Sequence, residues 1–374
     1  TLALGLGLAF ASTVGAEQAG KLVDHYDGVP PEAMTPATPA ARGYSPYAGR
    51  KYPTRPLFGD THHHTSNSGD AFMAGNRLSP EEAYRFARGE EVVSSTGVPA
   101  KLSRPMDFLV ISDHAEGLGL MFQVYEGNPA FMQDPILVGW NKAMKEGGKA
   151  AADAANDVVS RQAQNTLPAP IKDPKIVGPV MQSVWQQYTA TAEKYNDPGR
   201  FTAMIGYEWT SVPGGNNLHR NVIFRDGKDK ADQVFPFSAW NSEDPQQLWA
   251  WMEAYEQRTG GRALAIPHNG NLSNGRMYAA QAFDGSAITK DYAARRQRWE
   301  PIQEIVQMKG ASESHPKLSP SDEFLEYGIA GWELGNLTLG GKLTAEMMPT
   351  SYVRAGFMRG LEHEAKLGVN PFKS

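Results

Sequence analysis

Three consecutive histidines, His62, His63 and His64, stand in the segment GDTHHHTSNSGD, which ends at Asp70. In an extended segment successive side chains point to opposite faces, so His62 and His64 share a face and His63 points away. This H-x-H pair predicts a two-nitrogen clamp for one divalent ion, with His63 packing or supporting the site from behind. The triplet alone does not decide this, because a single histidine beside a strand is more often structural than a ligand.

Other metal-capable side chains accompany four short apolar runs that are typical of buried strands. The runs are MDFLVIS (106–112), FTAMIGYEW (201–209), RALAIPH (262–268) and PIQEIVQMKG (301–310). At or just after their ends stand Asp113 with His114, Glu208, His268, and Lys309 with His315. Because the carboxyl ends of parallel strands meet on one face, we expect these residues to gather at one site. Singly, Glu208 could be a buried paired carboxylate and His268 a turn residue, but jointly they favour a metal centre.

The chain of 374 residues contains no cysteine, which excludes thiolate metal sites, disulfides and cysteine nucleophiles. A metal would have to be held by histidine nitrogen and carboxylate oxygen, a donor set that suits zinc, manganese or iron. The 36 basic and 41 acidic side chains leave a net charge of −5, and the basic ones are scattered. This charge pattern argues against nucleic acid or an anionic membrane as a partner.

Helical segments separate the strand-like runs. Ser79 and Glu82 form a capping box at the start of EEAYRFARG, Asp244-Pro245 opens QQLWAWMEAYEQRTG, and TSYVRAGFMRGLEHEAKLG ends on Gly368. Strands that alternate with helices predict an α/β fold with a parallel sheet, open or closed. The segment from about 120 to 199 is mostly helical and carries none of the metal-capable residues above, so we interpret it as an insertion or lid.

The N-terminal residues predict export. The apolar run TLALGLGLAFASTVGAEQ is too short to span a bilayer comfortably, and Val14-Gly15-Ala16 has the small residues of a cleavage site. We interpret residues 1–16 as part of a secretory signal, with an N-terminal membrane anchor as the alternative. Residues 17–55 are rich in proline and alanine and predict an extended lead-in, which leaves 56–374 for the folded domain. The processed protein is then expected in the periplasm or outside the cell, without a membrane attachment.

Several segments together resemble one known group of proteins. The similarity is to the PHP superfamily, named for polymerase and histidinol phosphatase domains, and within it to the DUF3604 branch of exported proteins. It rests on LFGDTHHHTSNSGDAF, LSPEEAYRFARGEEV, RPMDFLVISDHAEGLG, GYEWTS, NNLHRNVIFRD, IPHNGNLSNGRM and WEPIQEIVQMKGASESHP. The resemblance implies a distorted (β/α)7 TIM-like barrel, two or three divalent metals at the strand ends, and phosphoester hydrolysis as the usual chemistry.

Carried over position by position, the resemblance implies the metal ligands His62, His64, Asp70, His114, Glu208, His219 and His268, with Asp113 as a further candidate. His62 and His64 would bind one ion, His219 and His268 a second, and Asp70 and His114 a third, with Glu208 as the bridge. His315 is the candidate general acid, and Arg276 and Lys309 could neutralise substrate charge. A surface or loop role is the alternative for these last three residues.

These residues predict an exported metal-dependent hydrolase of a small anionic or ester substrate, with phosphate esters as the first class. Another ester or an amide is one alternative, and a non-catalytic metal- or ligand-binding protein is the other. The second alternative arises because the late Asp-x-His motif of PHP proteins does not occur before Ser374. We therefore expect this motif and the C-terminal part of the barrel to lie outside the sequence. Four aromatic residues, Phe72, Tyr207, Trp209 and Trp299, either favour a substrate with an apolar or ring portion or belong to the core.

Overall fold

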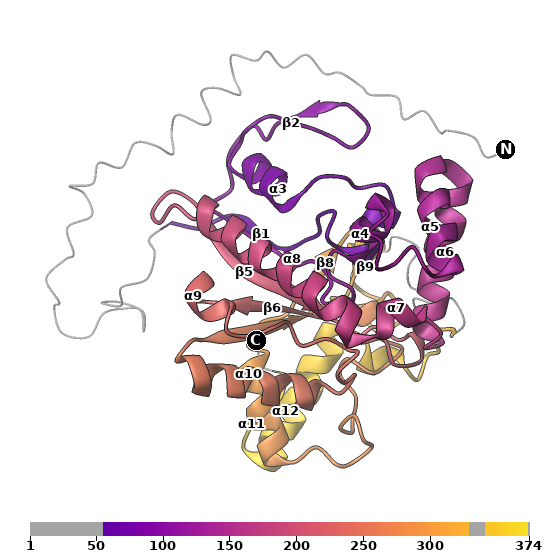
Figure 1. Cartoon of the computed structure of the whole chain (residues 1–374). Coiled ribbons are helices and arrows are strands. Elements are labelled where there is room, and N and C mark those ends of the chain that lie inside the picture. Colours follow the sequence, from indigo (N-terminus) through magenta and orange to yellow (C-terminus); the bar gives the residue numbers. More distant parts are fainter. Residues whose placement is uncertain (1–54, 329–340, 373–374) are drawn as a thin grey trace, which may run out of the picture. The chain divides into compact units, whose positions relative to one another are not determined.

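A five-stranded sheet carries the metal-capable side chains in the computed structural model, which describes residues 55–328 and 341–372 (Figure 1). Across the sheet the strands are β1 (Gly59–His63), β4 (Phe108–Ile111), β5 (Thr202–Trp209), β6 (Arg220–Phe224) and β7 (Ala263–Pro267). The sheet curls like half of a barrel. Two short strand pairs lie outside it: β2 (Val92–Val93) with β3 (Pro99–Ala100), and β8 (Val306–Gln307) with β9 (Gly310–Ala311).

The strand directions bring the functional side chains to one edge of the sheet. β1, β4 and β5 pair in parallel, and β6 is antiparallel to both β5 and β7. β7 therefore runs in the same direction as β1, β4 and β5, and the carboxyl ends of these four strands share an edge with the amino end of β6. His219, the residue before β6, reaches that edge for this reason.

The α/β class agrees with the sequence, whereas the all-parallel arrangement of the sheet was not correct. Ten residues, 210–219, separate β5 from β6, and a parallel return needs a crossover of about a dozen residues or more. The chain turns back instead, and β6 takes an antiparallel place. The strand predicted over 301–310 is also wrong, because this range contributes only to the β8–β9 pair. Its apolar side chains are half exposed rather than buried, with Ile302 at 47% and Val306 at 61%.

Eleven α-helices occur within the described residues. They are α2 (Gly69–Met73), α3 (Pro80–Ala87), α4 (Leu120–Glu126), α5 (Pro135–Glu146), α6 (Gly148–Ala163), α7 (Ala169–Lys172), α8 (Pro174–Tyr195), α9 (Lys228–Ala231), α10 (Pro245–Thr259), α11 (Lys290–Trp299) and α12 (Val353–Leu367). The predicted capping box of Ser79 and Glu82 starts α3, and Asp244 accepts a hydrogen bond from the Gln246 N–H at the start of α10. α12 ends at Gly368, whose φ of 77° is the left-handed conformation that glycine adopts readily.

Helices cover one face of the sheet and leave the other to the candidate site. α3 packs against β4, α8 against β5, and α10 and α11 against β7. Alternation along β5 sends Tyr207 and Trp209 into this helix-covered core. It sends Glu208, between them, to the other face, where Val110, Ile223 and Ile266 form a separate small apolar cluster.

The segment from 120 to 199 is helical, as the sequence predicts, but it divides into two parts. α8 belongs to the layer on the sheet, where Trp185 meets Tyr207 edge to face with ring centroids 6.2 Å apart. α4 to α7 pack mainly on one another, on α2 and on α8, and Figure 1 shows α5 and α6 side by side.

Among the described residues, no helix combines the length and the apolar character that crossing a membrane requires. The signal segment predicted over 1–16 and nearly all of the lead-in predicted over 17–55 fall outside the described residues.

Candidate metal centre

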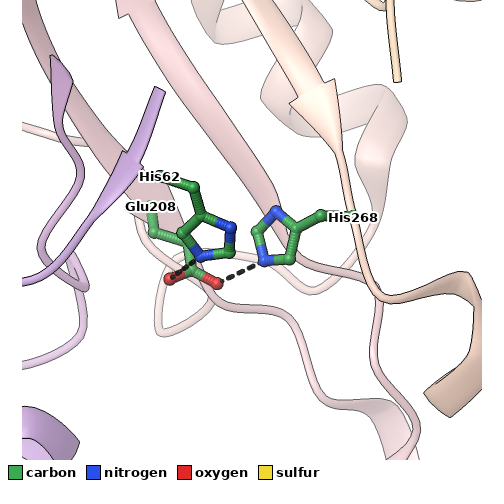
Figure 2. Close-up of side chains that lie close together, drawn as sticks. All are labelled: His62, Glu208 and His268. Carbon is green, nitrogen blue, oxygen red and sulfur yellow. Dashed lines mark hydrogen bonds and ion pairs between the residues drawn. The ribbon is translucent and has the colours of Figure 1, made fainter. Parts of the chain in front are cut away.

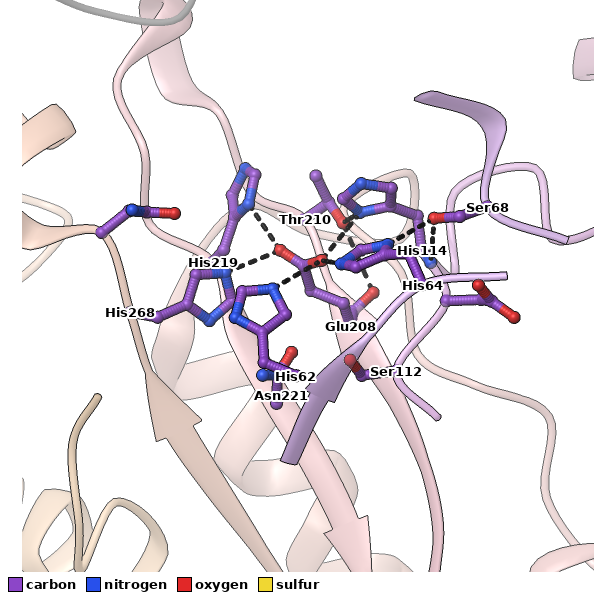
Figure 3. A network of polar contacts seen from close by, with 12 residues as sticks. His62, His64, Ser68, Ser112, His114, Glu208, Thr210, His219, Asn221 and His268 are labelled. Carbon is purple, nitrogen blue, oxygen red and sulfur yellow. Dashed lines mark hydrogen bonds and ion pairs between the residues drawn. The ribbon is translucent and has the colours of Figure 1, made fainter. Parts of the chain in front are cut away.

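Glu208 lies among five histidines at the shared edge of the sheet (Figure 3). Its side chain is 1% exposed, and its backbone forms a parallel bridge with His114 just beyond β4. The five rings come from the carboxyl ends of β1, β4 and β7 and from the amino end of β6: His62, His64, His114, His219 and His268.

Each carboxylate oxygen of Glu208 faces a different set of ring nitrogens. Oε1 is 2.6 Å from His219 Nδ1 and 2.8 Å from His268 Nε2. Oε2 is 3.1 Å from His64 Nε2, 3.2 Å from His114 Nδ1 and 3.7 Å from His62 Nε2. One carboxylate on β5 therefore contacts ring nitrogens from the other four strands of the sheet, an arrangement that suits a bridging ligand.

Within the described residues, two groups of three side chains could hold a metal ion. One is His62, Glu208 and His268, and the other is His64, Asp70 and His114. In each group the ligand atoms lie within 4.8 Å of one another, and Figure 2 shows the first group converging from β1, β5 and the end of β7. Because Glu208 Oε2 also contacts His64 and His114, the carboxylate joins the two groups.

This grouping differs from the H-x-H clamp that alternation predicts. His62 and His64 lie in different groups, and their ring centroids are 5.2 Å apart. β1 has a register irregularity between Asp60 and His63, so regular alternation does not extend through the triplet. His63 is in neither group.

Further polar side chains orient three of the rings. His62 Nδ1 donates to Glu304 Oε2 at 2.6 Å, which leaves Nε2 facing Glu208. His64 Nδ1 is 2.6 Å from Ser68 Oγ, and His114 Nδ1 is 2.5 Å from Thr210 Oγ1. A histidine that is held through one nitrogen presents the other in a fixed direction, which is the usual support of a metal-binding imidazole.

Several buried polar atoms of Glu208 and the histidines around it lack hydrogen-bond partners, which fits a bound cation better than a set of side chains that satisfy one another. Glu208 Oε2, both nitrogens of His219 and Nδ1 of His268 are buried and make no contact with hydrogen-bond geometry within the described residues. His268 Nε2 does form a hydrogen bond with Glu208 Oε1, whereas the approaches of the other four rings to Glu208 lack hydrogen-bond geometry. Such atoms would each cost about 1–3 kcal/mol if left unsatisfied, and their concentration around one carboxylate indicates a shared ligand.

The protonation pattern leaves two rings neutral. Burial lowers the pKa of His219 to about 4, and burial together with the charge of His62 lowers the pKa of His268 to about 3. Burial alone would also lower the pKa values of His62 and His114, but nearby carboxylates raise them by more. Glu208 and Glu304 raise the pKa of His62 to about 9, and Asp70 and Glu208 raise the pKa of His114 to about 10. Glu208 stays ionised, because the surrounding imidazoles hold its pKa well below its usual range despite burial.

A cavity of about 790 Å³ adjoins the second group. Asp70, His114, His219 and Thr210 line its polar part together with Lys309, which lies between β8 and β9. Lys309 lies close enough to lower the pKa of both Asp70 and His219. No ion pair is recorded for Lys309 in the part of the chain that the structure describes.

The sequence matches a family model described as "Protein of unknown function (DUF3604)" over residues 51–374. The chain belongs to the DUF3604 family. No curated protein and no solved structure matches the chain. The metal-capable groups of this DUF3604 chain therefore have to be interpreted from its own geometry.

The other predicted site residues lie in different surroundings. His315 packs beside the Tyr352 ring and accepts a hydrogen bond from the Lys317 N–H at 3.1 Å, and its general-acid role stays a prediction. Arg276 is exposed and is not among the residues that line the cavity. Asp113 is buried and accepts hydrogen bonds from Thr65 N and Oγ1, which fixes the loop after β1.

Sequence reasoning missed Glu304 and the hydroxyl partners of the histidines. Glu304 lies 242 residues from His62 in a run interpreted as a strand, so no spacing linked the two. It also missed Glu116, which lines the cavity and accepts hydrogen bonds from the N–H groups of Thr210 and Ala239. The HAEG segment that holds Glu116 was visible next to His114 and could have indicated it.

Proposed function

We propose that this DUF3604 chain is a metal-dependent hydrolase that cleaves esters, with phosphate esters as the first candidate class. The observation that carries the proposal is the contact of one buried carboxylate with five histidines. Two ions that share a carboxylate are a recurring device for hydrolysis, and nitrogen and oxygen donors suit zinc, manganese or iron.

The proposal extends to the fold, as a distorted (β/α)7 TIM-like barrel of the PHP type. In support, β1, β4, β5 and β7 run in the same direction and their carboxyl ends carry candidate ligands. Sites at this end of the strands are the rule in barrels of this kind. The antiparallel β6 departs from a regular barrel but adds His219 at the same edge.

The two groups would hold two cations. His62, Glu208 and His268 would bind one, and His64, Asp70 and His114 the other, with His219 beside the Glu208 oxygen that faces His268. When bound, such cations polarise the ester, acidify water and offset the negative charge that develops during hydrolysis.

The protein's own groups would orient the donors and receive the substrate. Glu304, Ser68 and Thr210 hold the rings of His62, His64 and His114 through Nδ1. Lys309 faces the cavity without a carboxylate partner among the described residues, so it would neutralise an anionic oxygen of the substrate. The signal segment predicted over 1–16 would place this activity in the periplasm or outside the cell.

The test is hydrolysis by protein that has been stripped of metal and then reloaded with Zn²⁺, Mn²⁺ or Fe²⁺. The substrates are 4-nitrophenyl phosphate, bis(4-nitrophenyl) phosphate, 4-nitrophenyl sulfate and 4-nitrophenyl acetate. We expect turnover of a phosphate ester that disappears on chelation and returns with the cation. Two bound cations without turnover of any of these esters would instead show a metal-binding protein that is not a hydrolase of this kind.

A further inference from the structure

The cavity beside the candidate metal centre has an apolar wall opposite its polar part. This wall comes mainly from α2 and from α4 to α7, the helices outside the sheet layer. Most of its side chains are aliphatic or thioether groups, for example Met73, Leu120, Met121, Met144, Val158 and Ile171, and Asn156 and Gln162 of α6 add two amides. Residues without side-chain bulk, such as Ala151 and Ala155 of α6, leave the space open between them.

The space beside this apolar wall is too large to be an ordinary gap between packed core side chains. Protein interiors are packed with few voids larger than a water molecule, whereas this space measures about 790 Å³. That volume is in the range of pockets that take small organic ligands, which are lined mostly by apolar groups with a few polar ones. The same cavity contains Asp70 and His114 of the second metal-capable group, so an occupant of the apolar part would reach the centre.

The lining favours a flexible chain over a flat ring. Methionine and leucine adapt to irregular aliphatic surfaces. One indole ring, that of Trp240, lines the cavity outside the wall of α2 and α4–α7, and the four aromatic residues proposed from the sequence lie elsewhere. Phe72, Tyr207, Trp209 and Trp299 are all buried in the hydrophobic core and do not line the cavity. The core interpretation of these four residues therefore holds, and most of the apolar contact in the cavity comes from the helices.

We propose that the substrate is an amphiphilic ester: an anionic head at Lys309 and the metal-capable groups, and an unbranched aliphatic chain along the wall of α2 and α4–α7. The position of the head rests on the proposed function. The binding of the chain rests on the cavity alone. The helical segment 120–199 is then the part of the molecule that selects the substrate.

The experiment uses n-alkylphosphonates from ethyl to octyl, because their carbon–phosphorus bond resists hydrolysis and binding can be measured by calorimetry. Each methylene that enters the apolar part should tighten binding roughly twofold to fourfold, hence roughly fiftyfold or more from ethyl to octyl. We expect this gain in the full chain both with Zn²⁺ or Mn²⁺ and after chelation, since the wall exists in both forms. Binding that is independent of chain length would overturn the inference.

Variants localise the effect to the cavity. Val159→Glu places a carboxylate on the α6 wall at a side chain that is 48% exposed, and it should remove most of the chain-length gain. Val93→Glu is the matched control, because Val93 is 57% exposed on β2 and is not a lining residue. Ala155→Phe narrows the space, so the affinity should stop rising at a shorter chain. Equal chain-length gains in Val159→Glu, Val93→Glu and the unaltered chain would place the alkyl group outside this cavity and contradict the inference.

The outcomes separate this inference from the proposed function. If cations bind and ethylphosphonate binds more tightly in their presence, but longer chains gain nothing, the metal centre stands and the amphiphilic substrate is wrong. If the chain-length gain occurs but no divalent cation binds, the wall takes an aliphatic chain and the hydrolase proposal is wrong.

Discussion

At the scale of residues, the site depends on where Glu208 lies along β5. Neighbours on either side, Tyr207 and Trp209, are fully buried in the helix-covered core, so alternation turns Glu208 to the opposite face. There its two oxygens contact different rings, and the imidazole charges keep it ionised despite burial. A charge this deeply buried needs partners, and either protons on the rings or cations can supply them.

The histidine triplet gives a prediction at single-residue resolution. His62→Ala removes a nitrogen that faces Glu208, so the affinity for the cation should fall by roughly a hundredfold or more. His63→Ala removes a ring that lies in neither group, so its affinity should stay within about threefold of the unaltered chain. Calorimetric titration of Zn²⁺ or Mn²⁺ into each metal-free variant measures both values. Equal losses in the two variants would show that the triplet is arranged differently.

The sequence predicts which residues are candidate ligands better than it predicts how they are grouped and which side chains orient them. His114, Glu208 and His268 stand at the ends of apolar runs, and their local context is enough to bring them to the same edge. The division of His62 and His64 between two groups follows from an irregularity in the pairing of β1 with β4, which no local pattern encodes. Glu304 supports His62 through a contact between distant segments, so only the folded chain reveals it.

At the scale of elements, the amino end of β6 is fixed by a buried ionic network next to His219. Arg220 Nε lies 3.0 Å from Glu300 Oε1, and Trp249 Nε1 donates to the same oxygen at 2.9 Å. Arg296 Nε lies 3.1 Å from Glu300 Oε2. Burial raises the pKa of Glu300, but the two guanidinium groups lower it overall, so the carboxylate is charged.

Removing the Glu300 carboxylate should lower the stability of the fold, because Glu300 belongs to neither metal-capable group. Glu300→Ala leaves two buried guanidinium groups without their shared partner, which should lower the free energy of unfolding by about 3–5 kcal/mol. Glu313→Ala breaks a solvent-exposed pair with Arg354 and should change the stability far less. Urea unfolding followed by circular dichroism compares the two variants. Similar midpoints for both would mean that the network does not hold β6 as described.

The elements show where sequence patterns suffice and where they fail. β4, β5 and β7 lie within runs of apolar residues, and α3, α10 and α12 begin or end at recognisable caps, so their positions could be predicted. β6 was not predicted, because the short run NVIF lies between polar segments and its antiparallel direction depends on the length of the preceding loop. The run over 301–310 has strand-like composition, but its place outside the sheet depends on tertiary packing.

At the scale of the whole molecule, the helices outside the sheet layer and the edge of the sheet form one cavity. The sequence indicated the helical character of residues 120–199 but no role in the chemistry. Its lining residues are spread over α4 to α7 without a motif, and they adjoin the metal-capable groups only through packing. A cavity made from dispersed aliphatic side chains leaves no signature in the order of residues.

The protonation of the site predicts that protons and cations compete. In the metal-free chain His62 and His114 have pKa values raised from 6.5 to about 9 and about 10. Their protonation therefore stabilises the metal-free fold fully below pH 6.5, and this contribution is lost as the pH rises through 9 to 10. A bound cation must displace these protons, so its affinity should rise with pH by up to about tenfold per unit for each proton released.

Two measurements check this linkage. Calorimetry near pH 7.5 in buffers of different ionisation enthalpy should report the release of about two protons when both groups are filled. The increase in melting temperature caused by Zn²⁺ or Mn²⁺ should be larger at pH 8.5 than at pH 6.5. An increase that is independent of pH, with no proton release, would contradict the raised pKa values of His62 and His114.

The central claim is that Glu208 joins two metal-binding groups. It is tested most directly by the metal content of the purified, Mn²⁺- or Zn²⁺-reloaded chain, measured by inductively coupled plasma mass spectrometry. The unaltered chain should hold about two cations, and Glu208→Gln, which keeps the shape but removes the charge, should hold less than half of one. Glu323→Gln, at an exposed position outside both groups, is the matched control and should hold the full amount. A Glu208→Gln chain that retains both cations would show that the five histidines do not depend on this carboxylate, and the account of the centre given above would be wrong.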